Sequence, residues 1–299
     1  MKTMLLYITW NPDIYAIRLG SWGIRWYSLC WLIGLLLGYL LMKYLYNEQG
    51  ITWQKRLIKG KQAMINVFDP LFVYIFVGVL IGGRLGHCLF YQPDYFLSSW
   101  PHVVEMLLPI RLDEGAGWHF TGYEGLASHG GVIGMLIAIW LYHRATSVPV
   151  WTVLDNMGIC SGITATFIRL GNLMNSEIVG KVTDLPWAFI FSRNDALPRH
   201  PGQLYEAIAY AIILCLIWLV YKKKGPKSVG TGFFFGLCLT LVFTARFIIE
   251  FTKDIQVDFE SGMIFDMGQL LSLPFMAIGL ACMAGGTWIV RLGAKPRKP

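Results

Sequence analysis

Charged and hydrogen-bonding side chains recur inside stretches that are otherwise apolar, and their spacing follows the helical repeat. Arg169, Asn172 and Ser176 stand three and four residues apart at the end of the run "VLDNMGICSGITATF". Positions separated by three, four or seven residues share one face of a helix. An unpaired guanidinium in hydrocarbon is costly, so an arginine there needs a carboxylate, a water-filled cavity or an anionic ligand.

Other apolar stretches carry polar residues in the same way, always near one end. They are Arg84, His87 and Tyr91 in "GGRLGHCLFY", His129 in "EGLASHGGVIG", His200, Gln203 and Glu206 in "LPRHPGQLYE", Arg246 and Glu250 in "ARFIIEF", and Tyr27 in "IRWYSL". Three arginines and a glycine-flanked helix start near His129 would suit phosphate oxygens, because guanidinium groups and free backbone N–H groups both bind them. The pattern predicts a shared polar cavity that binds an anion.

Structural explanations compete with this interpretation. Arg169 could pair with Glu177 or Glu206, and Arg246 with Glu250 four residues later. The glycines around Arg84 could serve close helix packing alone. Histidine as a residue type suits proton transfer near neutral pH, so His129 suits a catalytic or headgroup role, whereas His200 could equally be a structural cap.

The elements that must position these residues are membrane helices. Of 299 residues, 55% are hydrophobic and only 14% charged, and the mean hydropathy is +0.52. Seven stretches are long enough to cross about 30 Å of hydrocarbon. They predict an all-α, polytopic membrane protein with one integral membrane domain over residues 1–299 and segments at about 24–45, 68–91, 127–144, 151–174, 203–221, 230–252 and 266–290.

The basic residues predict the orientation of these segments. Lysine and arginine concentrate in the connections 43–70, 142–150 and 222–229 and in the C-terminal tail. By the positive-inside rule these parts are cytoplasmic, which places the N-terminus outside and the C-terminus inside. All the polar ends described above then lie in the outer half of the bilayer. An anion there is most simply a phospholipid headgroup.

Several function classes lack support. The net charge of +7 does not come from a basic patch with interleaved aromatics, so no nucleic-acid partner is expected. The six cysteines show no metal-ligand spacing, so neither a metal nor another cofactor is expected. Motifs of serine hydrolases, zinc proteases and nucleotide-binding proteins are absent from the sequence.

The chain resembles the prolipoprotein diacylglyceryl transferases of bacterial inner membranes. The resemblance extends from Trp26 to Pro274 and rests on blocks that follow the family's order and spacing. These are "GGRLG" (82–86), "SHGG" (128–131), "RLGNLMNSEIVG" (169–180), "LPRHPGQLYE" (197–206), "ARFIIEF" (245–251) and "MGQLLSLP" (267–274).

This resemblance implies a seven-helix fold and a defined reaction. The diacylglyceryl group of phosphatidylglycerol would move to the lipobox cysteine of a preprolipoprotein signal peptide, forming a thioether and releasing glycerol phosphate. It implies catalytic roles for His129, Arg246, Glu250 and Tyr27. The lipid would be bound by Arg169, Asn172, Arg246, Arg84, Glu177 and Gly180, and further candidates are His200, Glu206, Gln203 and His87.

The sequence departs from the family at three positions. Val242 and His87 stand where many members have tyrosine, and Ser176 stands where they have glycine. His129, His200, Glu206 and Glu250 all remain candidates for the general base. Two other functions stay open: an anion or lipid transporter with an outward-facing, arginine-lined site, and a structural subunit that binds lipid without turnover.

Overall fold

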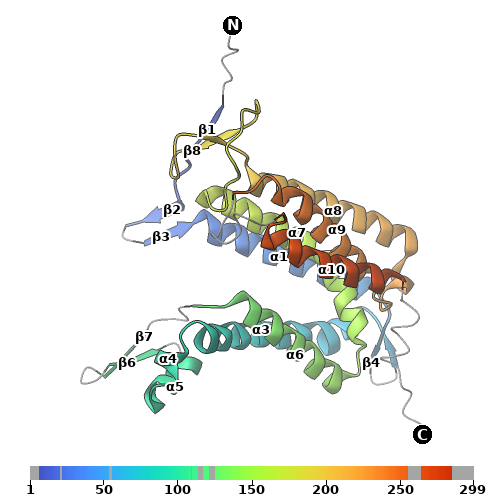
Figure 1. Cartoon of the computed structure of the whole chain (residues 1–299). Coiled ribbons are helices and arrows are strands. Elements are labelled where there is room, and N and C mark those ends of the chain that lie inside the picture. Colours follow the sequence, from blue (N-terminus) through green and yellow to red (C-terminus); the bar gives the residue numbers. More distant parts are fainter. Residues whose placement is uncertain are drawn as a thin grey trace. The chain divides into compact units, whose positions relative to one another are not determined.

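The computed structural model describes residues 7–20, 22–53, 56–108, 110–113, 117–120, 125–254 and 264–284, and it is mostly helical (Figure 1). Its contacts divide the chain into two compact units. The first contains Met1–Leu45 and Trp151–Pro299, and the second contains Tyr46–Val150. The single integral membrane domain over residues 1–299 stays a prediction.

Long helices occupy all seven of the stretches predicted from hydropathy. They are α1 (Trp26–Glu48), α3 (Asp69–Phe90), α6 (Ser128–Thr146), α7 (Val150–Asn175), α8 (Gly202–Lys224), α9 (Phe233–Glu250) and α10 (Met267–Ala284). Five helical stretches of the described chain are long and apolar enough to cross a membrane. They are α1, the stretch Lys61–Phe90 that includes α3, and the helices α8, α9 and α10. A full set of seven spans and their orientation stay predictions, and residues 285–290 of the last segment lie outside the described residues.

The structure is consistent with the predicted all-α class, because the long segments are helices and the strands are short and lie in the connections. In the first unit β1 (Ile8–Trp10) pairs in parallel with β8 (Phe189–Phe191), which pairs with β9 (Pro198–Arg199), and β2 (Tyr15–Leu19) forms a hairpin with β3 (Trp22–Arg25). In the second unit β4 (Ile51–Trp53) pairs with β5 (Arg56–Ile58), and β6 (Ile110–Asp113) pairs with β7 (Gly117–Phe120). Backbone groups in connections need partners as much as those in helices do, and hairpins supply them.

The first unit is a bundle of helices whose core lies between α7, α8 and α9. Ile159 of α7, Ile213 and Ile217 of α8, and Phe234 of α9 are at most 5% exposed and form one cluster. Small residues let the backbones approach: a side chain on Gly158 would meet the backbone of Phe234 at 2.8 Å. The close packing fixes the ends of α7, α8 and α9 relative to one another, where the polar residues lie.

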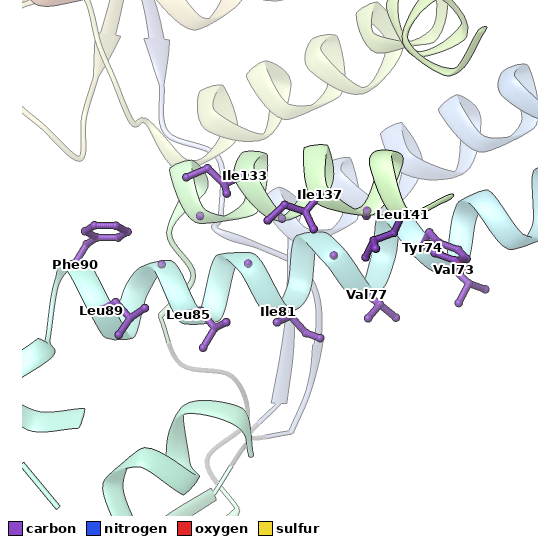
Figure 2. Close-up of a pocket in the computed structure, with 16 residues that line it drawn as sticks. Val73, Tyr74, Val77, Ile81, Leu85, Leu89, Phe90, Ile133, Ile137 and Leu141 are labelled. Atoms are coloured by element: carbon purple, nitrogen blue, oxygen red, sulfur yellow. The ribbon is translucent and has the colours of Figure 1, made fainter. Parts of the chain in front are cut away.

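The second unit is built on the pair α3 and α6, with a π-helical turn η1 (Met64–Phe68) leading from α2 (Lys61–Ala63) into α3. Short helices α4 (Pro93–Phe96) and α5 (Trp100–Leu107) follow α3. An apolar cavity of about 680 Å³ runs along the pair, lined by residues such as Val77, Ile81 and Ile137 (Figure 2). No charged side chain lines it, so the cavity itself offers nothing to a lipid headgroup.

Candidate functional site

Arg169 lies two turns before the end of α7, and the structure gives it a carboxylate partner. Its Nε is 2.8 Å from Oε2 of Glu206 on α8. Its Nη1 donates to Oδ1 of Asn172 at 3.3 Å. The side chain of Arg169 is 15% exposed, whereas that of Glu206 is fully buried. The sequence left Glu177 and Glu206 open as partners of Arg169, and the structure shows the pair with Glu206.

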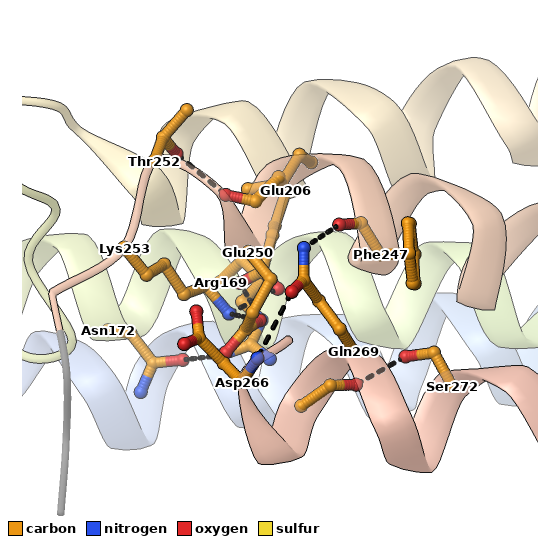
Figure 3. A network of polar contacts seen from close by, with 12 residues as sticks. Arg169, Asn172, Glu206, Phe247, Glu250, Thr252, Lys253, Asp266, Gln269 and Ser272 are labelled. Carbon is orange, nitrogen blue, oxygen red and sulfur yellow. Dashed lines mark hydrogen bonds and ion pairs between the residues drawn. The ribbon is translucent and has the colours of Figure 1, made fainter. Parts of the chain in front are cut away.

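Lys253 extends this ion pair into a chain of alternating charges (Figure 3). Its Nζ donates to Oε1 of Glu206 at 3.1 Å and to Oε2 of Glu250 at 2.9 Å. Only 4% of the Lys253 side chain is exposed. The order is Arg169, Glu206, Lys253 and Glu250, two positive and two negative charges that compensate one another. Such mutual compensation is what makes buried charge tolerable.

Arg246 lacks the partner that its sequence neighbours suggested. Glu250 pairs with Lys253 instead of with Arg246, and within the described residues no hydrogen bond or ion pair joins Arg246 to another group. It is only partly buried on α9. The buried Tyr210 on α8 is within electrostatic reach of both Arg169 and Arg246, so the two arginines lie in the same region of the first unit. Arg246 is thus a cation beside a self-compensated cluster.

Asn172, Glu177 and Gln203 form a second set of contacts around the end of α7. The Asn172 amide donates to Oε2 of Glu177 at 3.0 Å. The Gln203 amide, at the start of α8, donates to the backbone carbonyl of Glu177. Asn172 therefore joins Arg169 on one side to Glu177 on the other. Glu177 holds the loop that follows α7 rather than pairing with Arg169.

Gly180 is a point of close backbone approach. A side chain there would lie 2.6 Å from the carbonyl oxygens of both His200 and Thr252. Its own N–H donates to the His200 carbonyl at 2.9 Å, and it forms an isolated bridge with Lys253. Only a residue without Cβ fits between these two segments. The glycine therefore fixes the backbone from which the Lys253 side chain extends.

His200 and Tyr27 border this region without contacting the ion pairs. His200 precedes α8, its Nδ1 lies 3.1 Å from the Tyr205 hydroxyl, and burial lowers its pKa below the usual 6.5. Its imidazole is therefore neutral at pH 7 and can accept a proton. Tyr27, the second residue of α1, lies against α7, since a side chain on Gly171 would meet its ring at 3.0 Å.

The start of α10 closes the site on the side of Glu250. A side chain on Gly268 would lie 2.5 Å from Oε1 of Glu250, so the backbone of α10 contacts this carboxylate. Gln269, which is 1% exposed, donates to the carbonyl of Phe247 at 3.3 Å. The block "MGQLLSLP" thus positions α9 through its glycine and glutamine. Among the residues that the structure describes, no group of histidine, cysteine or carboxylate side chains could hold a metal ion.

Arg84, His87 and His129 belong to the second unit. Arg84 is buried and donates to the backbone carbonyl of Glu105 in α5 at 3.0 Å. His87 stacks on Tyr91, with the ring centroids 5.8 Å apart. His129 is exposed in the first turn of α6. Their predicted convergence with Arg169 and Arg246 stays a prediction, while Arg84 has a structural contact within its own unit.

Two residues near Arg169 in the first unit, Lys253 and Tyr210, were not anticipated from the sequence. Lys253 stands three residues after Glu250, a spacing that places both on one turn, and this was the available signal. Tyr210 stands one turn after Glu206 in an apolar helix, where a tyrosine resembles ordinary core.

The chain is similar to known proteins over nearly its full length. A family model described as "Prolipoprotein diacylglyceryl transferase" matches residues 14–285. A protein of Bacteroides fragilis named phosphatidylglycerol–prolipoprotein diacylglyceryl transferase is 50% identical over 283 residues, covering 95% of this chain and 96% of that protein. Proteins of the same name from Tolumonas auensis and Porphyromonas gingivalis are 42% and 38% identical, over 92% and 93% of this chain and 95% and 94% of theirs.

The resemblance inferred from the sequence motifs is therefore confirmed. The matched residues include α7, α8 and α9, which carry the arginines and carboxylates of the cluster. Since the match covers the second compact unit completely and most of the first, this chain belongs to the family of prolipoprotein diacylglyceryl transferases.

Proposed function

We propose that this chain transfers the diacylglyceryl group of phosphatidylglycerol to the thiol of a lipobox cysteine in a preprolipoprotein signal peptide. The new bond joins sulfur to the glyceryl carbon. The bond from that carbon to the phosphate oxygen breaks, so glycerol phosphate leaves with the electron pair. The names of the similar proteins supply the two substrates.

The observation that carries the proposal is how Arg169 and Arg246 in the first unit are paired. Arg169 is oriented by Glu206 and Asn172, and Arg246 has no partner in the described part of the chain. Guanidinium groups bind phosphate oxygens through paired N–H donors, and a fixed donor costs no reorganisation when charge develops on the leaving group. Arg246 would contact the phosphate directly, with Arg169 beside it.

The substrate thiol must lose its proton, because the thiolate is the nucleophile. Glu206 and Glu250 are already engaged by cations, which favours a histidine as the proton acceptor. His200 is neutral at pH 7, because burial lowers its pKa, and His129 is exposed at the start of α6. Asn172, Glu177, Gly180 and Gln203 would act by shaping the loop between α7 and α8, and Tyr27 by packing against Gly171.

The location of the reaction follows from the topology proposed from the basic connections. The chain would lie in the bacterial inner membrane with Arg169 and Arg246 toward the outer leaflet. There a phospholipid can diffuse laterally to the site, and a lipobox cysteine near the end of a signal peptide lies at the same depth.

The test uses the purified chain in nanodiscs that contain phosphatidylglycerol, with a lipobox peptide as acceptor. Mass spectrometry should show the peptide gaining a diacylglyceryl group, with release of glycerol phosphate. A peptide with serine in place of the cysteine should be inert. Arg246→Gln should lower the rate about 100-fold or more, the usual effect of removing one donor to developing charge.

Arg18→Gln is the matched control, because Arg18 is an exposed surface residue paired with Asp13. It should leave the rate unchanged. Because no described residue pairs with Arg246, Arg246→Gln should also leave the melting temperature unchanged. Arg169→Gln should lower the melting temperature, because it removes the guanidinium that pairs with the buried Glu206. Absence of both products from the wild-type chain, or full activity of Arg246→Gln, would refute the proposed function.

A further inference from the structure

Lys253 is a buried cation at the centre of the site to which neither the sequence motifs nor the proposed reaction gives a role. It stands outside the blocks that carry the family resemblance. Its backbone is fixed on two sides: its N–H donates to the Glu250 carbonyl at 3.0 Å, and it forms a bridge with Gly180. Its ammonium group therefore reaches Glu206 and Glu250 from a defined position.

Glu250 has two cations within reach along the chain. Arg246 precedes it by four residues on α9, and Lys253 follows it by three. Side chains at both spacings can form an ion pair on a helix, although an arginine that precedes its carboxylate is the less favourable order. In the structure Glu250 pairs with Lys253. The choice of partner decides whether Arg246 keeps its hydrogen-bond donors for a ligand.

The balance of charges supports a competition between Lys253 and Arg246 for Glu250. Glu206 and Glu250 together bring two negative charges, and Arg169 and Lys253 balance them. Without the ammonium group, Glu250 would be left with an uncompensated charge beside α10, at a position where 11% of its side chain is exposed. A largely buried carboxylate without a counter-ion is unfavourable, so it should form an ion pair with the nearest available cation. Arg246 is the nearest one on the same helix.

We propose that Lys253 is a positioning residue that occupies Glu250 and so keeps Arg246 available for the phosphate of the lipid substrate. The inference rests on the proposed function and deepens it, because it names what sets the affinity for the anionic headgroup. In Lys253→Met, the phosphate of phosphatidylglycerol must compete with Glu250 for Arg246. Lipid binding therefore weakens more than the chemical step slows.

The experiment measures KM for phosphatidylglycerol and kcat separately, together with lipid binding without a peptide. Binding is followed by native mass spectrometry in phosphatidylcholine nanodiscs titrated with phosphatidylglycerol. K253M is expected to raise both KM and Kd about tenfold, the equivalent of one lost hydrogen bond to a charged group, with a smaller change in kcat. The matched control is K181M, because Lys181 lies next to the same bridge but its side chain is exposed and, among the described residues, donates to the Phe251 carbonyl rather than to a carboxylate. It should leave both constants unchanged.

The double variant K253M/E250Q removes the cation and its competitor together. It restores charge balance, so it should fold even if K253M does not. Its KM and Kd should return to within about threefold of the wild type, whatever happens to kcat, because coupled partners show non-additive effects. A double variant that binds the lipid as weakly as K253M, or a folded K253M with unchanged KM and Kd, overturns the inference.

The outcomes separate this inference from the proposed function. If the wild type binds phosphatidylglycerol and K253M binds it more weakly, but no peptide is modified, the reaction is wrong and the role of Lys253 stands. If the wild type modifies the peptide while K253M keeps its KM and Kd, the reaction stands and the role of Lys253 is wrong. A wild type that neither binds the lipid nor modifies the peptide refutes both.

Discussion

Among the residues that the structure describes, the buried charges of this site pair with one another and leave Arg246 without an ion pair. Arg169 and Lys253 each contact Glu206, and Lys253 also contacts Glu250. Burying an ion pair gains little stability, because desolvation opposes the attraction, but removing one partner costs several kcal/mol. The cluster of Arg169, Glu206, Lys253 and Glu250 therefore contributes mainly by orienting side chains, and little by adding stability. It holds Arg169 in one orientation and does not engage Arg246.

Ser176 shows that the end of α7 carries backbone strain. Its φ of 56° lies in the left-handed region, which favours glycine, and Ile178 has the same value. The N–H of Glu177 donates to the Asn172 carbonyl at 3.0 Å, so Ser176 ends the helix in the manner of a C-terminal glycine. Its hydroxyl is buried without a hydrogen-bond partner in the described residues. Glycine would thus be the less strained residue at this position.

We predict that Ser176→Gly stabilises the protein. The left-handed conformation costs a residue with Cβ about 1 kcal/mol, and an unsatisfied buried hydroxyl adds to this cost. The free energy of unfolding should rise by about 1 kcal/mol, measured by thermal or denaturant unfolding in detergent micelles. Ser176→Ala is the control, because it removes the hydroxyl and keeps Cβ, so its gain should be smaller. A lower stability for the glycine variant would contradict the assignment of strain.

At the scale of elements, glycines decide which helices come closest. In the second unit Gly78 and Gly82 of α3 face Gly130 and Gly134 of α6, and a side chain on Gly134 would collide with the Gly78 carbonyl. Within a bilayer, lipid tails are as apolar as side chains, so close backbone packing replaces the hydrophobic effect as the driving force. The same spacing leaves the apolar cavity beside the pair (Figure 2).

In the first unit one carboxylate ties α7 to the start of α9. Asp155 is fully buried, and its Oδ2 accepts from the backbone N–H groups of Gly230, Thr231 and Gly232 at 2.8–3.0 Å. Its Oδ1 accepts from Phe235 at 2.9 Å. A helix start has four N–H groups without helical partners, and a side chain from another helix satisfies them here. This explains why α9 begins at Phe233 instead of at 230 as predicted.

We predict that Asp155→Asn destabilises the bundle. The amide replaces one acceptor oxygen with a donor, which leaves at least one buried N–H group unsatisfied at a cost of about 1–3 kcal/mol. The loss should appear as a lower free energy of unfolding in detergent. Transferase activity should fall as well, because α9 carries Arg246 and Glu250. Asp184→Asn, in an exposed loop, removes the same charge and should change neither quantity.

At the scale of the whole molecule, the topology is the property on which the proposed function depends most. The connection that contains η2 (Pro226–Ser228) follows three consecutive lysines, Lys222 to Lys224. The connection between α7 and α8 forms strands β8 and β9 and carries Arg199, which is held by Asp195 and Asp254 at 2.5 Å and 2.7 Å. The positive-inside rule assigns these two connections to opposite sides of the membrane.

Cysteine labelling in intact cells tests this assignment. Ser192→Cys should react with a membrane-impermeant maleimide, because Ser192 is exposed in the proposed outer connection. Lys227→Cys, equally exposed, should react only after the membrane is permeabilised. The wild-type chain sets the background from its six cysteines. The reverse pattern would place Arg169 and Arg246 toward the cytoplasm and contradict the orientation.

The sequence by itself determined the helices and the family. Long apolar runs specify helices in a membrane, because no other structure satisfies every backbone group without water. Helical spacing also grouped Arg169 with Asn172, and the motif blocks identified the family that the comparisons confirm. Contacts within one helix follow from periodicity alone, so these features were accessible without coordinates.

Only the tertiary structure decided which charges meet. Arg246 and Glu250 have the spacing of an ion pair, yet Glu250 pairs with Lys253. The reason lies in the turn after α9, which is held by its bridge to Gly180 on a different connection. Asp155 acquired its role in the same way, from backbone groups 75 to 80 residues further along the chain. Partners so distant in sequence are chosen by packing, because helical periodicity carries no information about which helix will lie alongside.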